Sequence, residues 1–265
     1  MTGMGVFRIA VVLALCSCCA SLAAELKKET LEDFARYIQA TEARIAEQTT
    51  GKRSFLWIDE SPQRQAQIRQ GQVVAQLFAG RSVQHVRDGL IHGWIGAVFV
   101  PGVTLDKALA LLRSYDDHYK LYQPEVMASK TLEHHQDHYR IYLRLLKKKV
   151  VTVVLNTEHD VQYFPLDRTR WHSRSYSTKI AQVDNPGDSN ERELPVGNDN
   201  GFLWRLYSYW RLQERDGGVY LECEAISLTR DIPTGFGWLI EPIIRDLPKE
   251  SLIKTLEATR KALTR

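Results

Sequence analysis

The amino-acid sequence predicts an α+β fold built on an antiparallel sheet. Amphipathic helical patterns lie near the start and at the end of the chain, and runs rich in β-branched and aromatic residues fill most of the second half. Tight turns join several of these runs, which is typical of antiparallel neighbours. The chain contains no internal repeat. This order of helices, strands, a helix, a series of strands and a closing helix predicts helices packed on one sheet.

Residues 1–24 have the three-part pattern of a secretory signal peptide. A short basic start precedes an apolar run over residues 9–15, which is too short for a stable membrane anchor, and small residues follow through Ala23 and Ala24. We expect cleavage after one of these alanines and a periplasmic or secreted mature protein. The alternative is a lipoprotein signal in which Cys18 is the lipidated residue.

Composition limits the partners of the mature chain. Cys223 is the one cysteine beyond the signal, so the fold must be stable without an internal disulfide. The full chain has 35 Lys and Arg against 32 Asp and Glu, scattered along the sequence, which is not the pattern of a nucleic-acid-binding surface. No later apolar run has membrane-spanning length, so we expect no integral membrane segment after signal cleavage. The oligomeric state stays open.

Residues 25–70 are predicted to form an N-terminal helical extension. Residues 30–48 carry apolar side chains at helical spacing, with Thr30 as the expected N-cap. A second, shorter helix is expected after Ser61, which is a good N-cap and is followed by Pro62 in the first helical position. These helices precede the first predicted strand.

Residues 71–265 are predicted to hold the sheet. Strands are expected at residues 73–78, 90–100, 139–146, 150–156, 161–166, 173–183, 203–214 and 219–228. Thr104 is the expected N-cap of a helix after the second strand, and residues 147–149 form a basic turn. Residues 185–200 are rich in Gly, Pro and charge and are expected to form a solvated loop. An amphipathic helix over residues 249–263 closes the chain.

The hairpin around Asp216 and Gly217 gives the sharpest prediction. An Asp-Gly pair between two alternating runs predicts a two-residue turn with positive φ. Counting outward pairs three couples on one face, Leu212 with Leu221, Trp210 with Cys223 and Ser208 with Ala225. The same register pairs Arg211 with Glu222 and Tyr209 with Glu224 on the other face. One face is therefore apolar or small, and the other carries charged partners.

Several of these segments resemble the bacterial START-like (SRPBCC, polyketide cyclase/lipid-transport) superfamily, in particular its exported members. They are GWIGAVFVP at 93–101, YQPEV at 122–126, SYSTKI at 175–180, the hairpin over 204–224 and ISLTRDIP at 226–233. The resemblance covers residues 71–265. It implies a helix-grip fold, in which a curved antiparallel sheet wraps around a long C-terminal helix and leaves an apolar cavity. The superfamily has no invariant catalytic signature.

Candidate ligand-binding residues follow from this resemblance and from the hairpin. They are Trp94, Phe99, Ser208, Trp210, Cys223 and Trp238. Bulky Trp210 beside small residues leaves room for a guest, unless side chains of the closing helix fill that room. Trp238 follows Gly235, Phe236 and Gly237 in a segment that we interpret either as a lid over the cavity or as a fixed loop.

The sequence offers little for catalysis. Residues 133–138, EHHQDH, have metal-ligating side chains but no second ligand group, so we interpret them as a turn. Cys223 faces Trp210 in the predicted register, which favours a buried, inert thiol over a nucleophile. We expect no catalytic residues, no cofactor and no metal. The favoured function is an exported carrier of a hydrophobic small molecule or lipid. The alternatives are a cyclase/aromatase-type enzyme and a cavity-free envelope interaction protein.

Overall fold

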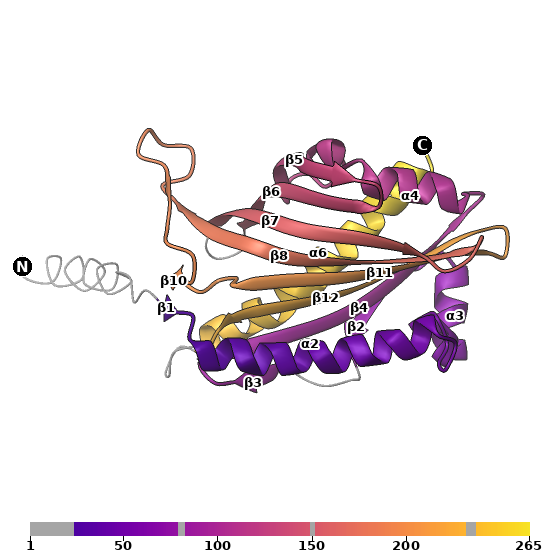
Figure 1. Ribbon diagram of the computed structural model, residues 1–265, viewed down its shortest axis with the longest axis horizontal. Helices are drawn as coiled ribbons and strands as arrows, with labels where there is room; N and C mark the ends of the chain where they lie inside the picture. Colours follow the sequence, from indigo (N-terminus) through magenta and orange to yellow (C-terminus); the bar gives the residue numbers. More distant parts are fainter. Residues whose placement is uncertain (1–23, 79–82, 149–151, 232–236) are drawn as a thin grey trace, which may run out of the picture.

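A large curved sheet with a long helix on each side forms the body of the molecule (Figure 1). The computed structural model describes residues 24–78, 83–148, 152–231 and 237–265, with side chains in the last range described from residue 247 onward. The 10-stranded sheet has the main strand order β2-β4-β12-β11-β8-β7-β6-β5, and its described neighbouring strands pair in antiparallel fashion. This confirms the predicted α+β helix-grip arrangement.

The strands, in chain order, are β1 Ala24–Glu25, β2 Val74–Leu77, β3 Gln84–Val86, β4 Gly89–Pro101, β5 Val126–His135, β6 His138–Lys148, β7 Thr152–Pro165, β8 Arg170–Asp184, β9 Arg192–Glu193, β10 Asn198–Asp199, β11 Arg205–Arg215 and β12 Gly218–Arg230. The helices are α2 Lys28–Thr49, α3 Pro62–Arg69, α4 Leu105–Arg113, α5 His118–Leu121 and α6 Gly237–Leu263, with 3-10 turns η1 Trp57–Glu60 and η3 Tyr115–Asp117. Strands β1 and β10 pair separately from the large sheet.

The hairpin of β11 and β12 has the predicted register. Trp210 pairs with Cys223 and Ser208 with Ala225, while Arg211 pairs with Glu222. The turn residues Asp216 and Gly217 have φ of 56° and 75°, as a two-residue turn of this type requires. The predicted caps of α3 and α4 are also confirmed, because Ser61 and Thr104 each accept a hydrogen bond from the backbone three residues on.

Other boundaries differ from the prediction. The expected strands 150–156 and 161–166 form one strand, β7, because β6 and β8 pair with it across the polar residues between them. Strand β6 continues through Lys148, so the basic turn is not where it was expected, and residues 149–151 lie outside the described residues. The loop over 185–200 contains β9 and β10, which bind its backbone to β8 and β1.

The predicted starts of two helices were also wrong. Helix α2 begins at Lys28, and Thr30 lies buried inside it, where its hydroxyl donates to the backbone oxygen of Arg87 at 2.8 Å. Helix α6 begins at Gly237 rather than at 249, so packing on the sheet carries it across Pro248 despite the hydrogen bond that a proline removes. Trp238 is therefore in the first turn of α6, while Gly235 and Phe236 lie outside the described residues.

Two glycines of β4 show how closely the long helices approach the sheet. A Cβ atom on Gly93 would collide with the hydroxyl of Tyr37 in α2. A Cβ atom on Gly96 would lie 2.9 Å from Leu256 Cδ1 in α6. Because side chains of a strand alternate between faces, the two helices cover opposite faces. We call the face under α6 the concave face and the face under α2 the convex face.

The convex face buries three charged side chains, Arg211, Glu222 and Glu224, and the partly buried Arg44 of α2 joins them. We call these four side chains the convex charge cluster. Arg44 of α2 donates two 2.7 Å hydrogen bonds to the Glu224 carboxylate, whose side chain is 0% exposed. Arg211 Nε donates to Glu222 at 2.7 Å, and the backbone of Ile58 donates to the same carboxylate at 3.3 Å. The helical extension therefore closes over the charges that the hairpin register predicts.

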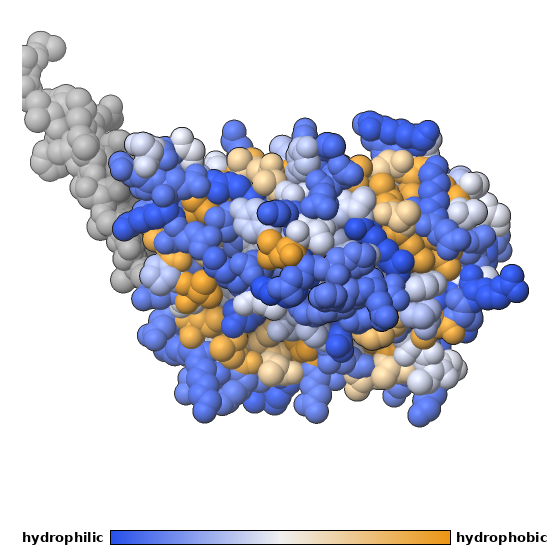
Figure 2. All heavy atoms as spheres, turned by 45° about the horizontal axis from the view of Figure 1, so that its top comes forward, coloured by the Kyte–Doolittle hydropathy of each residue, from blue (hydrophilic) through white to orange (hydrophobic). Residues whose placement is uncertain are grey.

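The surface is mainly hydrophilic on the face that Figure 2 shows, with separate hydrophobic areas. Exposed large hydrophobic side chains in the described part include Met127 and Leu132 of β5, at 48% and 39%, and Val196 and Phe202, at 50% and 44%. No described helix combines the length and the apolar character that a membrane span requires.

Candidate functional site

The centre of the concave face brings together four of the candidate residues. The strand register places Trp94 beside Ala225, which in turn lies beside Ser208. In the next row Cys223 lies between Gly96 and Trp210. Trp94, Ser208, Trp210 and Cys223 thus share one face of three adjacent strands. Their role in ligand binding stays a prediction.

The two other candidates lie elsewhere. Phe99 is on the convex face, where its ring lies 4.5 Å from that of Tyr220 in the cluster under η1 and α3. It is separated from Trp94 by the thickness of the sheet. Trp238 is in the first turn of α6, and its side chain lies outside the described side chains.

Apolar side chains fill one end of the concave face. Leu252, Leu256 and Leu263 of α6 pack there on the sheet and on α4. The sheet side of this cluster includes five side chains with 0% relative exposure: Val98, Val100, Leu212, Val219 and Leu221. This end is close-packed, as protein interiors normally are.

In the middle of the same face, the inward side chains are less completely buried. Ser175 of β8 and Ser208 and Trp210 of β11 point toward α6 from central strands, yet each retains partial solvent exposure. A close-packed interior would bury inward side chains in the middle of a wide sheet completely. We therefore locate the candidate binding site at these residues, between the sheet and α6.

Hydroxyl groups and two histidines line this part of the concave face. Ser173, Ser175 and Ser177 alternate along β8, and Ser227 lies on β12 next to His92 of β4. His159 of β7 pairs with Ser177. His92 is 0% exposed and His159 is 4% exposed, and burial lowers the pKa of each to about 4. Both imidazoles are therefore neutral at physiological pH.

Cys223 has the properties of a structural thiol. It is 4% exposed in the apolar cluster under α6. Burial raises the pKa of this thiol far above its usual range, so the thiolate that a nucleophile needs is not populated. The side chain contributes shape to the face and no reactivity.

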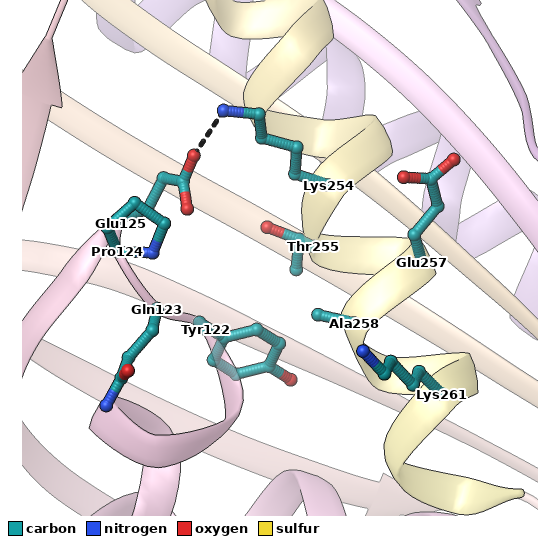
Figure 3. Close-up of a pocket in the computed structure, with 9 residues that line it drawn as sticks. All are labelled: Tyr122, Gln123, Pro124, Glu125, Lys254, Thr255, Glu257, Ala258 and Lys261. Atoms are coloured by element: carbon teal, nitrogen blue, oxygen red, sulfur yellow. Dashed lines mark hydrogen bonds and ion pairs between the residues drawn. The ribbon is translucent and has the colours of Figure 1, made fainter.

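A groove lies at the surface, where the corner after α5 faces α6. Figure 3 shows Tyr122, Pro124 and Glu125 on one side of this groove of about 300 Å³ and Lys254 on the other, where Lys254 donates to Glu125. The hydroxyl of Tyr122, which lines the groove, lies 3.1 Å from that of the buried Thr259. The ion pair between Lys254 and Glu125 spans the groove, and Glu257 and Lys261 also line it.

Lys147 lies near this groove and not at a solvated tip. Its side chain reaches under α6, where the ammonium group donates to Ser251 Oγ at 2.9 Å. Burial lowers the pKa of Lys147 to about 8, although Glu125 acts in the opposite direction. The residue attaches the end of β6 to the helix.

The histidine-rich segment 133–138 forms the end of β5, a turn at Gln136 and Asp137, and the start of β6. His134 stacks on Tyr139 with ring centroids 4.1 Å apart, and His138 Nε2 lies 2.7 Å from a carboxylate oxygen of Asp160. These side chains have partners other than one another. Within the described residues, no group of three or more metal-ligating side chains meets.

Sequence reasoning missed the polar part of the site. His92, His159, Ser175 and Ser177 were not among the candidates, yet the concave face holds all four. The alternation of serines at 173, 175 and 177 is a period-2 signal that could have placed them on one face. The histidines give no such signal, because each is single and sits in an otherwise apolar or mixed strand.

Solved structures similar to this chain have a low sequence identity to it. They include a STAR-related lipid transfer protein (fragment 25-204) from Xanthomonas axonopodis, with 18% identity, a TM-score of 0.44 and coverage of 70% of this chain and 98% of that one. The Zhui aromatase/cyclase from a Streptomyces species has 12% identity, a TM-score of 0.43 and coverage of 66% and 94%. Human STARD10 has 11% identity, a TM-score of 0.42 and coverage of 71% and 73%.

No protein-family model and no curated protein matches the chain in sequence. At these identities and TM-scores, the likenesses carry no argument about this chain. The helix-grip fold of this chain rests on its own strand order and on α6, which packs on β4, β12 and β2.

Proposed function

We propose that the chain is an exported binding or carrier protein for a hydrophobic small molecule or lipid. The guest lies between α6 and the middle of the concave face, and the protein works by sequestration. The observation that supports this most directly is the partial exposure of Ser175, Ser208 and Trp210 on central strands, beside an end of the same face that is fully packed. Export is proposed from the pattern of residues 1–24.

Native mass spectrometry of the mature protein, purified from its own cell envelope, tests this proposal. We expect a stoichiometric apolar compound that organic extraction releases, and an N-terminus that begins after Ala23 or Ala24. An empty protein that also takes up no fluorescent apolar probe would contradict the carrier function. An uncleaved, cytoplasmic protein would contradict export alone.

A filled-cavity variant gives the matched control. Ser208→Trp places a large ring in the middle of the concave face and is expected to abolish probe uptake while the chain still folds. Thr178→Trp places the same ring at an exposed position of β8 and is expected to leave uptake unchanged. Equal uptake by both variants would locate the ligand elsewhere.

A cyclase/aromatase-type enzyme is the second candidate, because His92 and His159 are buried titratable groups on the concave face. Burial lowers the pKa of each to about 4, which makes both weak bases at neutral pH. A general base works best with a pKa near the operating pH, so these histidines suit binding better than proton transfer. If the protein turns over a reactive polyketone and His159→Gln abolishes that turnover, the enzyme becomes the favoured function and the carrier the second candidate.

A further inference from the structure

A polar row crosses the concave face between two neutral histidines. His92 of β4 pairs with Ser227 of β12, and at the far side Ser177 of β8 pairs with His159 of β7. Leu206 of β11 lies between Ser227 and Ser177, and its backbone N–H donates a 3.0 Å hydrogen bond to Ser177 Oγ. All four polar side chains of the row are buried. Buried polar groups normally have hydrogen-bond partners, so a buried atom without one indicates what a ligand must supply.

The hydrogen bonds of His92 fix its tautomer. Its Nε2 lies 3.2 Å from the hydroxyl oxygen of Thr229, and that hydroxyl donates its own proton to the backbone oxygen of Arg230 at 3.2 Å. The oxygen of Thr229 must therefore accept from Nε2, which carries the ring proton. Since the imidazole is neutral, Nδ1 is a bare acceptor.

His159 repeats this arrangement at the other end of the row, on the same face of the sheet. Its Nε2 lies 3.0 Å from the hydroxyl of Thr157, and that hydroxyl donates to the backbone oxygen of Leu143 at 3.0 Å. The same reasoning places the proton of His159 on Nε2. Both ends of the row therefore carry the same neutral tautomer, held by a threonine.

Two buried ring nitrogens on β4 have no hydrogen-bond partner among the described residues: His92 Nδ1 and Trp94 Nε1. The two residues are next neighbours on the concave face, and Trp94 is 6% exposed. One atom is an acceptor and the other a donor. Lys249 of α6 lies over the ring face of Trp94 at 5.7 Å from its centroid, so the ammonium group contacts the π face of the indole.

We propose that the guest of the concave face carries an uncharged hydroxyl head group, which donates to His92 Nδ1 and accepts from Trp94 Nε1. This inference rests on the proposed function and names the class of ligand, a long-chain or polycyclic alcohol. A carboxylate has no proton to donate to Nδ1, so it would leave that buried acceptor unpaired. A protonated amine has no lone pair for the Trp94 N–H group.

Binding of three probes that share one alkyl chain and differ in the head group tests the inference. The mature protein is titrated with the alcohol, the carboxylate and the amine, and each displaces a fluorescent apolar probe. We expect the alcohol to bind about ten- to a hundredfold more tightly than the other two, which is the usual effect of a buried group left unpaired. Equal binding of all three, or tighter binding of the carboxylate or of the amine, overturns the hydroxyl inference and leaves the carrier function standing. Failure of the apolar probe itself to bind overturns both.

Two conservative variants assign the preference to the two ring nitrogens. Trp94→Phe keeps an aromatic ring and removes the donor, and His92→Phe removes the acceptor. Each is expected to lower the preference for the alcohol by about tenfold while binding of the apolar probe persists. His85→Gln, at an exposed histidine of β3, is the control and should change nothing. If Trp94→Phe folds and keeps the full preference for the alcohol, the inference is wrong.

The nitrogen chemical shifts of His92 give a readout that a structural role would not affect. In the ligand-free protein, Nδ1 should show the shift of an unprotonated nitrogen and Nε2 that of a protonated one. Addition of the alcohol should move the Nδ1 signal and leave Nε2 in place, because Thr229 holds Nε2 in both states. An Nδ1 signal that does not respond to saturating alcohol contradicts the proposed contact.

Discussion

The two faces of the central strands bury polar groups in opposite ways. The convex face holds the convex charge cluster, in which each charge has an opposite charge beside it and α2 closes over the set. The concave face holds hydroxyls and neutral imidazoles, and the middle of it is not fully covered. A buried charge is stable only with its partner in place, whereas a neutral polar face tolerates a change of guest. The difference supports our proposal that the convex face is structural and that the concave face binds the ligand.

Removal of Arg211 should cause the largest effect. Arg211→Met leaves two buried glutamates, Glu222 and Glu224, with Arg44 as their one remaining cation in the cluster. We expect a loss of about 3–5 kcal/mol in the free energy of unfolding, because an uncompensated charge stays buried. Urea denaturation monitored by tryptophan fluorescence measures it.

The double variant Arg211→Met with Glu222→Met is the control for this loss. It removes the Nε–carboxylate pair and leaves the pair of Arg44 with Glu224. Most of the lost stability should return, because an apolar replacement of a buried pair is often neutral. If the double variant is less stable than the single one, charge pairing does not explain the stability of the convex face.

Acid should act on the concave face through its histidines. The unfolded imidazole of His159 binds a proton below pH 6.5, while burial lowers the pKa of the folded side chain to about 4. Stability is therefore complete above pH 6.5 and is lost as the pH falls toward 4, by up to about 3 kcal/mol for this group. Other buried histidines add to the slope, so the measured quantity is the difference between the wild type and His159→Gln across this range. Identical pH profiles for the two proteins would show that His159 is not held neutral by burial.

These predictions rest on a fold that the sequence largely specified. The register of β11 and β12 followed from Asp216 and Gly217 alone, because an Asp-Gly turn sets the pairing of every residue beyond it. The caps at Ser61 and Thr104 are equally local signals. Features that depend on tertiary contacts were missed. Strand β7 continues across a polar stretch because its neighbours pair with it, and α6 continues across Pro248 because it packs on the sheet.

The candidate site shows the same division between local and tertiary information. Trp94, Ser208, Trp210 and Cys223 were brought to one face by alternation and register, which sequence contains. Phe99 shared their aromatic character, but its odd position in β4 puts it on the convex face. The neutral state of His92 depends on Thr229, which lies across a strand pair and whose contact no local pattern reveals.

The two glycines of β4 sharpen the comparison, since each touches the helix of a different face. Gly96→Ala places a Cβ atom 2.9 Å from Leu256 Cδ1 and 3.1 Å from the backbone oxygen of Val74, so the Leu256 side chain must move and β2 must shift slightly. We expect a loss of about 1–3 kcal/mol and a weaker uptake of the apolar probe. Gly93→Ala meets the hydroxyl of Tyr37 in α2 and should cost a similar amount without changing uptake. Thermal unfolding and probe titration on both variants separate the faces, and reduced uptake in Gly93→Ala alone would reverse the assignment.

The smallest expected effect lies at the centre of the site. Ser208 keeps partial contact with solvent although it points inward, so Ser208→Ala should change the free energy of unfolding by less than about 0.5 kcal/mol. In a close-packed, hydrogen-bonded interior, loss of a hydroxyl partner would cost about 1–3 kcal/mol. Chemical denaturation of the ligand-free protein distinguishes these values. A loss in the larger range would mean that the middle of the concave face is as closely packed as its apolar end. The two faces would then differ in the charge of their buried groups and not in the access that they give to a ligand.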